Sequence, residues 1–131
     1  MILREDAPSV TTATLRTAEP YLAFARAVGV FAPAWRPAPG IHAMSAVAAT
    51  AQIAASASVG AFACVAEDVV IGERTVIFPH VTIGRGAHIG ADCVVHAQVS
   101  IREDVTMGDR VVLQDGVVVG GDGYGFVRRA D

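Results

Sequence analysis

The sequence predicts an all-β fold, a left-handed parallel β-helix of hexapeptide repeats preceded by a short N-terminal helical segment. An aliphatic side chain recurs at every sixth residue from Ile41 to Val119, a small or β-branched residue follows most of these positions by four residues, and glycine often comes directly after them. A period of six fits neither a helix nor an alternating strand, but it is the period of a hexapeptide β-helix. The aliphatic positions are Ile41, Val47, Ile53, Val59, Val65, Ile71, Ile77, Ile83, Ile89, Val95, Ile101, Met107, Leu113 and Val119.

The composition suits this fold. Hydrophobic residues make up 53% of the 131 residues, but aromatic residues only 6%. The core is therefore expected to consist of small and β-branched side chains, which pack well in stacked strands. We expect three hexads to close one triangular coil, and coils to stack about 4.8 Å apart. The aliphatic residue should fill a corner of this prism, and glycine should relieve crowding where the backbone turns.

The N-terminal part differs from the repeats. Residues 1–18 are polar and mixed, although their Thr and Val content would allow a strand. Residues 19–31 are predicted to form a short packing helix, with Pro20 in its first turn. Its apolar side chains recur at helical spacing: they are Leu22, Phe24, Ala25, Val28 and Phe31.

Proline-rich residues 32–40 predict a stiff connector between the helix and the repeats. The chain is accordingly divided into an N-terminal part at residues 1–40, a β-helix at 41–119, and a Gly-rich loop that leaves the prism at 120–131.

The charges are distributed unevenly around the predicted prism. Residues 18 apart stack, so the hexads sort into three faces, of which two carry many charged residues. The third face, which includes hexad 77–82, has Asp115 as its one formal charge. Exposed aromatic groups beside uncharged polar groups favour a contact surface, so we expect this face to meet other copies around a threefold axis. Its outward columns are Phe62, His80 and Gln98, and Phe78, His96 and Gln114.

Several function classes are excluded by composition. The net charge is −3 without a Lys/Arg cluster, which argues against binding to nucleic acid. Residues 37–66 lack Asp, Glu, Lys and Arg, but are too rich in Ala, Ser, Thr and Gly for a transmembrane segment. The N-terminus lacks a signal-peptide pattern, which favours the cytoplasm. Cys64 and Cys93 form no CxxC motif and are expected to be free, buried thiols.

Three stretches carry a resemblance to a known family. The hexads resemble those of left-handed β-helix acyltransferases, and within them the chain resembles the UDP-3-O-acylglucosamine N-acyltransferases of lipid A biosynthesis. Residues 19–31 ("EPYLAFARAVGVF") resemble the helix that joins the family's uridine-binding domain to its prism. Residues 93–119 resemble its middle coils, and "GGDGYGF" at 120–126 resembles its Gly-x-Asp-Gly-Phe-Gly-Phe/Tyr motif.

The resemblance implies an activity and partners. The family transfers a 3-hydroxyacyl chain from acyl carrier protein to the amine of a UDP-glucosamine, works as a homotrimer with active sites between subunits, and uses a histidine as general base. It implies no cofactor. Residues 1–40 would be the remnant of the uridine-binding domain, so this chain is expected to be an incomplete part of the enzyme.

The resemblance places no catalytic residue within this chain. The family's base lies in an Ile-Ala-His-Asn-like context without a counterpart here, so it is expected beyond Asp131. His80 lies three residues after Ile77, whereas the family's base lies two after its aliphatic residue, so His80 is expected at the trimer interface. His96 lies in "VVHAQV", which resembles non-catalytic coils of the family, and is expected at the interface too. The Gly-rich segment is either a loop leaving the prism or a loop lining the acyl or sugar site. In the second case the substrate-binding residues are Asp122, Gly123, Tyr124 and Phe126.

A metal site is not expected. The γ-class carbonic anhydrases, which share the fold, hold zinc with histidines that include a pair five residues apart. Here His80, His88 and His96 are spaced by eight. Two alternatives to the lipid A interpretation remain open: another hexapeptide-repeat acetyltransferase that uses acetyl-CoA, and a non-catalytic β-helix scaffold.

Overall fold

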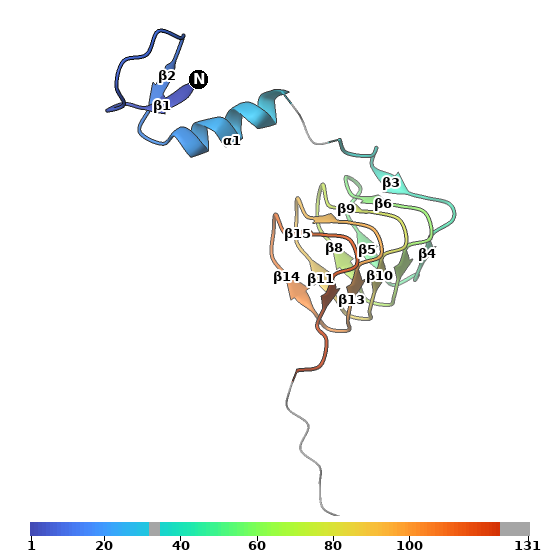
Figure 1. Cartoon of the computed structure of the whole chain (residues 1–131). Coiled ribbons are helices and arrows are strands. Elements are labelled where there is room, and N and C mark those ends of the chain that lie inside the picture. The colour runs from blue at the N-terminus through green and yellow to red at the C-terminus, as the bar shows by residue number, and fades with distance from the viewer. Residues whose placement is uncertain (32–34, 124–131) are drawn as a thin grey trace, which may run out of the picture. The chain divides into compact units, whose positions relative to one another are not determined.

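The structure, a computed structural model, describes residues 1–31 and 35–123. The chain divides into two compact units, Met1–Arg36 and Pro37–Asp131. Figure 1 shows the helix in the first unit and the coiled strands in the second. Each unit is built from its own elements.

The first unit contains two short strands and a helix. Strand β1 (Ile2–Arg4) pairs in parallel with β2 (Leu15–Thr17), and Ile2 lies opposite Leu15. Helix α1 (Pro20–Phe31) follows and contacts both strands, which confirms the predicted helix. No residue of α1 is buried, so its packing is looser than the sequence suggests. Among the described residues, no helix has the length and apolar character needed to cross a bilayer.

The second unit is a parallel β-solenoid whose hexapeptide repeats are those of a left-handed β-helix, so the predicted fold class is confirmed. Its three sheets have the orders β16-β13-β10-β7-β4, β14-β11-β8-β5 and β15-β12-β9-β6-β3 (Figure 1). The strands are β3 (Gly40–Ile41), β4 (Ala46–Val47), β5 (Gln52–Ile53), β6 (Ser58–Val59), β7 (Cys64–Val65), β8 (Val70–Ile71), β9 (Val76–Ile77), β10 (Thr82–Ile83), β11 (His88–Ile89), β12 (Val94–Val95), β13 (Ser100–Ile101), β14 (Thr106–Met107), β15 (Val112–Leu113) and β16 (Val118–Val119).

The register between coils follows the sequence period. Each solenoid strand pairs with the strand three further along the chain, so that Thr82 lies between Cys64 and Ser100. Side chains at the same hexad position therefore form columns along the prism. Each coil therefore packs against its two neighbours through equivalent side chains, as is usual in solenoid folds.

In the middle coils, two positions of each hexad form the core. The aliphatic residue is buried, as at Ile71, Ile77 and Ile83, each 1% exposed. The residue four positions later is also buried, as at Ala63 and Val81. The small residue lets the opposite walls approach, and the core is mainly aliphatic.

The corners lie elsewhere than expected. Each aliphatic residue is the second residue of a strand, as Ile77 is in β9, and the chain turns two and three residues later, at Pro79 and His80. A six-residue period locates an inward position, but it does not distinguish a strand from a corner. What the sequence presents as three faces are consequently three edges of the prism, each formed by a column of turns.

Several glycines directly after the strands allow neighbouring coils to approach closely, and they do not supply the left-handed conformation of the turn. A Cβ added at Gly72 would lie 2.6 Å from the carbonyl carbon of Gly90 in the next coil. The left-handed backbone conformation falls two residues later in the hexad, and non-glycine side chains mostly occupy it. These residues are Phe62, Asp68, Arg74, His80, Asp92, Gln98, Asp104 and Arg110.

Candidate functional site

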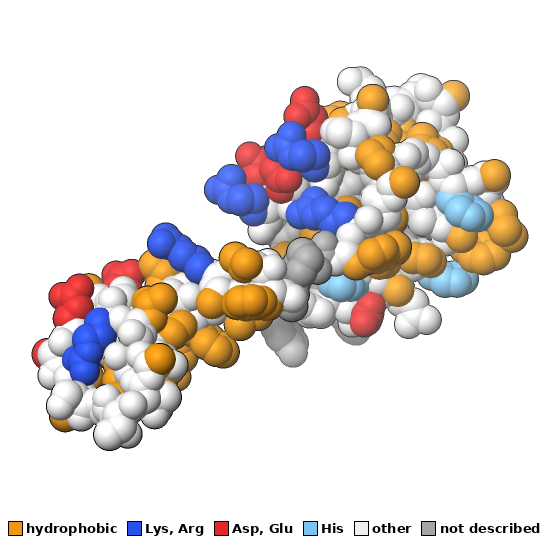
Figure 2. Space-filling model, turned by 90° about the horizontal axis from the view of Figure 1, so that it is seen from above, with side chains coloured by type: hydrophobic (Ala, Val, Ile, Leu, Met, Phe, Trp, Pro, Cys, Tyr) orange, Lys and Arg blue, Asp and Glu red, His pale blue; other side chains and the backbone are white. Residues whose placement is uncertain are grey.

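One edge of the prism is aromatic and almost free of charge. We define the Phe/His edge as residues 42–44, 60–62, 78–80, 96–98 and 114–116, where the chain passes from the β3-containing sheet to the β4-containing sheet. Asp115 is its one formal charge. Figure 2 shows histidines among hydrophobic side chains on one side of the prism and the charged side chains gathered on another.

Two aromatic stacks run along this edge. Phe62 stacks on His80, and Phe78 stacks on His96, each pair with ring centroids 5.1 Å apart. The interplanar angles are 16° and 10°, so the rings are close to parallel. Each pair joins successive coils, because its members are 18 residues apart. Phe62 remains 48% exposed although it is large and apolar.

The structure brings all six predicted interface residues to this edge. Gln98 continues the first column and Gln114 the second, and both are exposed. His42, at the start of the edge, accepts a hydrogen bond at Nδ1 from the backbone N–H of Met44 at 3.1 Å. That these residues contact other copies of the chain remains a prediction.

Ion pairs lie on the other two edges. Arg74 binds Asp92 of the next coil through two hydrogen bonds of 2.7 and 2.9 Å, and also contacts Glu73. These carboxylates raise the pKa of Arg74 above its ordinary value, mainly through the hydrogen bond to Asp92. Arg102 pairs with Glu103 at 3.0 Å. Such exposed pairs keep these edges solvated and contribute little to stability.

A groove lies on the outer side of the sheet β16-β13-β10-β7-β4, over strands β4, β7 and β10. Its volume is about 850 Å³. Its floor is made of small outward side chains, including Ala46, Cys64 and Thr82. A Cβ added at Gly84 would lie 2.7 Å from the backbone nitrogen of Glu103, so glycine keeps this part of the floor low.

The two long sides of the groove differ in character. One side borders the Phe/His edge. The other side carries Glu67, Arg85 and Glu103 from successive coils. The pKa of the Glu103 carboxyl is lowered, first by a hydrogen bond from its own backbone N–H and then by Arg102. The groove can therefore hold an apolar chain on its floor and polar groups at one rim.

Cys64 corrects the sequence-based expectation that both cysteines are buried. Cys93 is 0% exposed in the core, whereas Cys64 is an exposed free thiol on the groove floor. Cys64 precedes Val65 in β7, and alternation along the strand directs it outward. The hexad position distinguishes the two thiols, because only Cys93 lies four residues after an aliphatic position.

The Gly-rich segment leaves the prism beside Arg102, which precedes the groove residue Glu103. Gly120 follows β16 with a φ of +83°, and a Cβ there would lie 2.6 Å from Val105 Cγ2. Asp122 and Gly123 are exposed. The charge of Asp122 contributes, after that of Glu103, to raising the pKa of Arg102. Of the predicted substrate-binding residues, Tyr124 and Phe126 lie outside the described residues.

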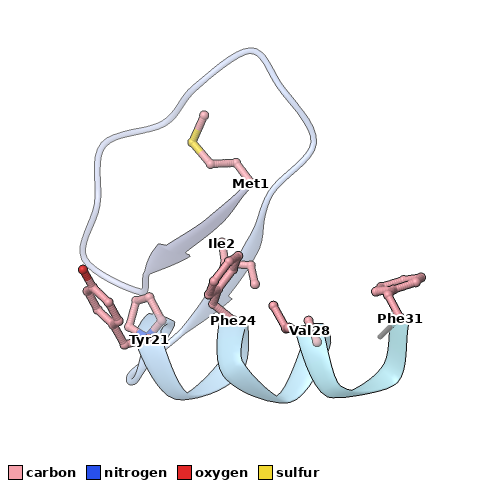
Figure 3. Close-up of a pocket in the computed structure, with 8 residues that line it drawn as sticks. Met1, Ile2, Tyr21, Phe24, Val28 and Phe31 are labelled. Carbon is pink, nitrogen blue, oxygen red and sulfur yellow. The ribbon is translucent and has the colours of Figure 1, made fainter. Parts of the chain in front are cut away.

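The first unit holds a second cavity, which the sequence did not reveal. Its volume is about 740 Å³, and Figure 3 shows Phe24, Val28 and Phe31 on the side of α1 that faces Ile2. The apolar residues at helical spacing in 22–31 are the part of the sequence that forms this cavity. They were predicted to pack against other elements instead. Tyr21 is 92% exposed and Phe31 88%.

The described residues contain no group of three or more His, Cys, Asp or Glu side chains that could hold a metal ion. His88, on β11, is exposed and lies on a different sheet from the groove. The other three histidines, His42, His80 and His96, lie in turns of the Phe/His edge.

Comparisons with known proteins identify the class of the repeats. Residues 86–121 match the family model described as bacterial transferase hexapeptide (six repeats). No curated protein sequence matches the chain. Over these residues the hexad register of the structure and this family model agree.

Two solved structures share the fold. The UDP-N-acetylglucosamine acyltransferase of Francisella novicida is similar with a TM-score of 0.56 and 28% identity, over 60% of this chain and 33% of that chain. Isoform 3 of serine acetyltransferase from Entamoeba histolytica, solved with cysteine, has a TM-score of 0.52 and 16% identity, over 71% of this chain and 38% of that one. At that identity the second likeness concerns the fold alone. The chain spans between a third and two fifths of these proteins.

Proposed function

We propose that this chain is part of an N-acyltransferase that moves a 3-hydroxyacyl group from acyl carrier protein to the amine of UDP-3-O-acylglucosamine in lipid A biosynthesis. The observation that carries the proposal is the groove on the β16-β13-β10-β7-β4 sheet. The last strand of that sheet leads directly into "GGDGYGF". The repeat family and the similarity to an acyltransferase support the same class of reaction.

The groove suits an acyl donor for physical reasons. Its floor of Ala, Thr, Cys and Gly leaves room along the prism axis, and adjacent strands add about 4.8 Å of length each. An apolar chain laid there removes apolar surface from water, which is favourable at about 25 cal/mol per Å². Arg85, between Glu67 and Glu103 on the rim, offers a polar environment for the carrier arm.

The catalytic base is proposed to lie beyond Asp131, and Asp122, Gly123, Tyr124 and Phe126 to line the substrate site. A neutral imidazole there would take the proton of the amine as the thioester carbonyl is attacked, and the carrier thiol would leave. This chain supplies the scaffold, the groove and the substrate segment. The cytoplasm is the proposed location.

Acetyl transfer from acetyl-CoA is the second candidate. It is favoured by the same groove, because an open trough without a closed end fits a pantetheine arm whatever acyl group it carries. The two donors differ in the group that bears the arm, which is a folded carrier protein in one case and a nucleotide in the other. Direct comparison of the donors therefore separates the two candidates.

The test measures binding of each donor and then acyl transfer. We expect 3-hydroxyacyl carrier protein, but not acetyl-CoA, to protect Cys64 from alkylation. Thr82→Trp should fill the groove and weaken donor binding about 10-fold or more, because a bulky ring displaces the ligand. Thr106→Trp is the matched control, since Thr106 is also an exposed first residue of a strand but lies on β14 in another sheet.

Acyl transfer to UDP-3-O-acylglucosamine is then assayed with this chain and with a chain extended past Asp131 to include the expected base. Transfer by the extended chain supports the proposal. Failure of both chains to transfer the group, or equal donor binding by Thr82→Trp and Thr106→Trp, would contradict it. Protection of Cys64 by acetyl-CoA alone would favour the second candidate.

A further inference from the structure

We propose that Arg102 is a positioning residue: it fixes the path on which the Gly-rich segment leaves the prism and keeps Asp122 close to the groove. The proposal rests on the proposed function, because it gives the segment a fixed place beside the donor groove. The evidence is the hexad position of Arg102, the packing of Gly120 on its side chain, and the two carboxylates that act on its guanidinium.

Arg102 interrupts a column of small residues along the groove. In the first three coils the residue directly after each strand of the grooved sheet is Ala48, Ala66 and Gly84, and all three line the groove. In the next coil this position is Arg102, which follows β13, and only Glu103 of that coil lines the groove. The long side chain therefore lies at the end of the groove nearest to β16 and the Gly-rich segment.

The pairing of β13 with β16 brings Arg102 to the point where the segment departs. Ile101 lies opposite Val119, and the backbone N–H of Arg102 donates a hydrogen bond to the carbonyl of Val119 at 2.9 Å. Gly120 follows Val119 and occupies the same hexad position as Arg102, one coil later. Regular pairing with the preceding coil thus extends to Val119, and the departure begins at Gly120.

Gly120 leaves the regular path of the coil against the side chain of Arg102. Its φ is +83°, whereas every other positive φ within the described residues 41–123 falls two residues later in the hexad. A Cβ built on Gly120 would lie 3.0 Å from Cβ of Arg102 and 2.6 Å from Cγ2 of Val105. The direction of departure is therefore set by a backbone conformation that glycine allows and by the stem of Arg102.

The guanidinium of Arg102 connects the groove with the segment. Its Nε donates a hydrogen bond to Oε2 of the groove residue Glu103 at 3.0 Å. The pKa of Arg102 is raised first by this hydrogen bond and the charge of Glu103, and then by the charge of Asp122. Two carboxylates that would otherwise repel each other share one cation. Because Arg102 and Glu103 are about half exposed, salt weakens this attraction, whereas the contact of the stem with Gly120 does not depend on salt.

The composition of the segment explains why a restraint at its start matters. Residues 120–126 include four glycines, and glycine loses more conformational freedom on ordering than any other residue. A ligand that binds one arrangement of the segment binds more weakly when a smaller fraction of the chains adopts that arrangement. By restricting the first residues of the segment, Arg102 raises this fraction before the substrate binds.

The first test measures the backbone order of the segment in the full chain, without a ligand. NMR relaxation gives the amide order parameters of Asp122 and Gly123. We expect values of about 0.85 in the unmodified chain and below about 0.6 in Arg102→Ala, which lacks both the stem and the charge. Arg110→Ala is the matched control, because Arg110 is an exposed arginine of the last described coil on another edge. It should leave both values unchanged.

Further variants separate the contact from a general disturbance. Arg102→Lys keeps a long stem and a positive charge, so it should largely restore the order parameters. Gly120→Ala keeps Arg102 but places a methyl group against its side chain and against Val105, so it should shift the amide resonances of Asp122 and Gly123. Gly108→Ala, at the same hexad position with nothing within 4 Å, is its control. Far-UV circular dichroism establishes that each variant is folded.

The second test is acyl transfer by the chain extended past Asp131. In Arg102→Ala we expect the KM for UDP-3-O-acylglucosamine to rise about 10-fold, as when the competent fraction falls to about a tenth. The kcat should change little, because bound substrate itself keeps the segment in place. A role of Arg102 in stability alone would instead lower kcat, through loss of folded protein, and leave KM unchanged.

Four outcomes would overturn the proposal: equal order parameters in Arg102→Ala and Arg110→Ala, no recovery in Arg102→Lys, equal amide shifts in Gly120→Ala and Gly108→Ala, or a loss of kcat at unchanged KM. Absence of transfer by the unmodified extended chain contradicts the proposed function alone, because the order parameters judge Arg102 without substrate.

Discussion

Thr75 lies directly below Cys93 in the core of the prism and ties two coils together. Its Oγ1 accepts a hydrogen bond from the backbone N–H of Cys93 at 3.0 Å and donates one to the carbonyl of Gly90 at 2.7 Å. Both side chains are 0% exposed. A polar hydroxyl is therefore retained in an otherwise aliphatic core because the backbone above it requires a partner.

We expect Thr75→Val to destabilise the solenoid. Valine fills the same volume but leaves the Cys93 N–H buried without a partner, which costs about 1–3 kcal/mol in the free energy of unfolding. Urea denaturation followed by circular dichroism measures this change. Thr75→Ser is the control, since it keeps the hydroxyl. Equal unfolding midpoints for Thr75→Val and the unmodified chain would show that the bond is dispensable.

Glycines after the strands should differ sharply in their tolerance of alanine. The Cβ of Gly72→Ala would meet backbone atoms of the next coil, at Gly90 and Ala91, within 2.8 Å. Such overpacking costs about 1–3 kcal/mol. Gly108→Ala meets nothing within 4 Å and is the matched control at the same hexad position. The melting temperatures of the two variants measure this difference. A similar decrease in melting temperature in both variants would contradict the steric explanation.

The two cysteines should react at different rates in the folded chain. A maleimide should label Cys64, which is exposed, and leave Cys93, which is buried, until the chain is unfolded. Mass spectrometry of tryptic peptides locates the label. Labelling of Cys93 at the rate of Cys64 without denaturant would mean that the core opens readily.

The carboxyl of Glu103 should titrate below the ordinary range of glutamate. Its own backbone N–H and then Arg102 lower its pKa, so the carboxylate stabilises the fold at neutral pH, and this contribution is lost as the pH falls through the lowered pKa. In Arg102→Gln the pKa should rise only part of the way, because the backbone N–H remains. Carbon-detected NMR titration measures both values, and an unchanged pKa would exclude a role for Arg102.

The fold could be predicted from the sequence because the residues that repeat every six positions are those buried in the core. The period located Ile71 and Ile77 in the core, and the 18-residue spacing placed Phe62 over His80. The predicted position of the corners was wrong. Inward strand positions and corners both recur every six residues, so the period alone does not distinguish them. The groove was missed because small residues such as Ala46 and Thr82 form it by leaving space, and no single residue type indicates it.

The two ends of the solenoid are unlike, because every strand pairs in parallel with the strand of the next coil. The first coil leaves β3, β4 and β5 as sheet edges, and the last described strands, β14, β15 and β16, form the opposite edges. Association that continues the parallel pairing therefore joins the last coil of one copy to the first coil of another. It runs head to tail and grows into an open filament, because a contact between unlike ends does not close on itself.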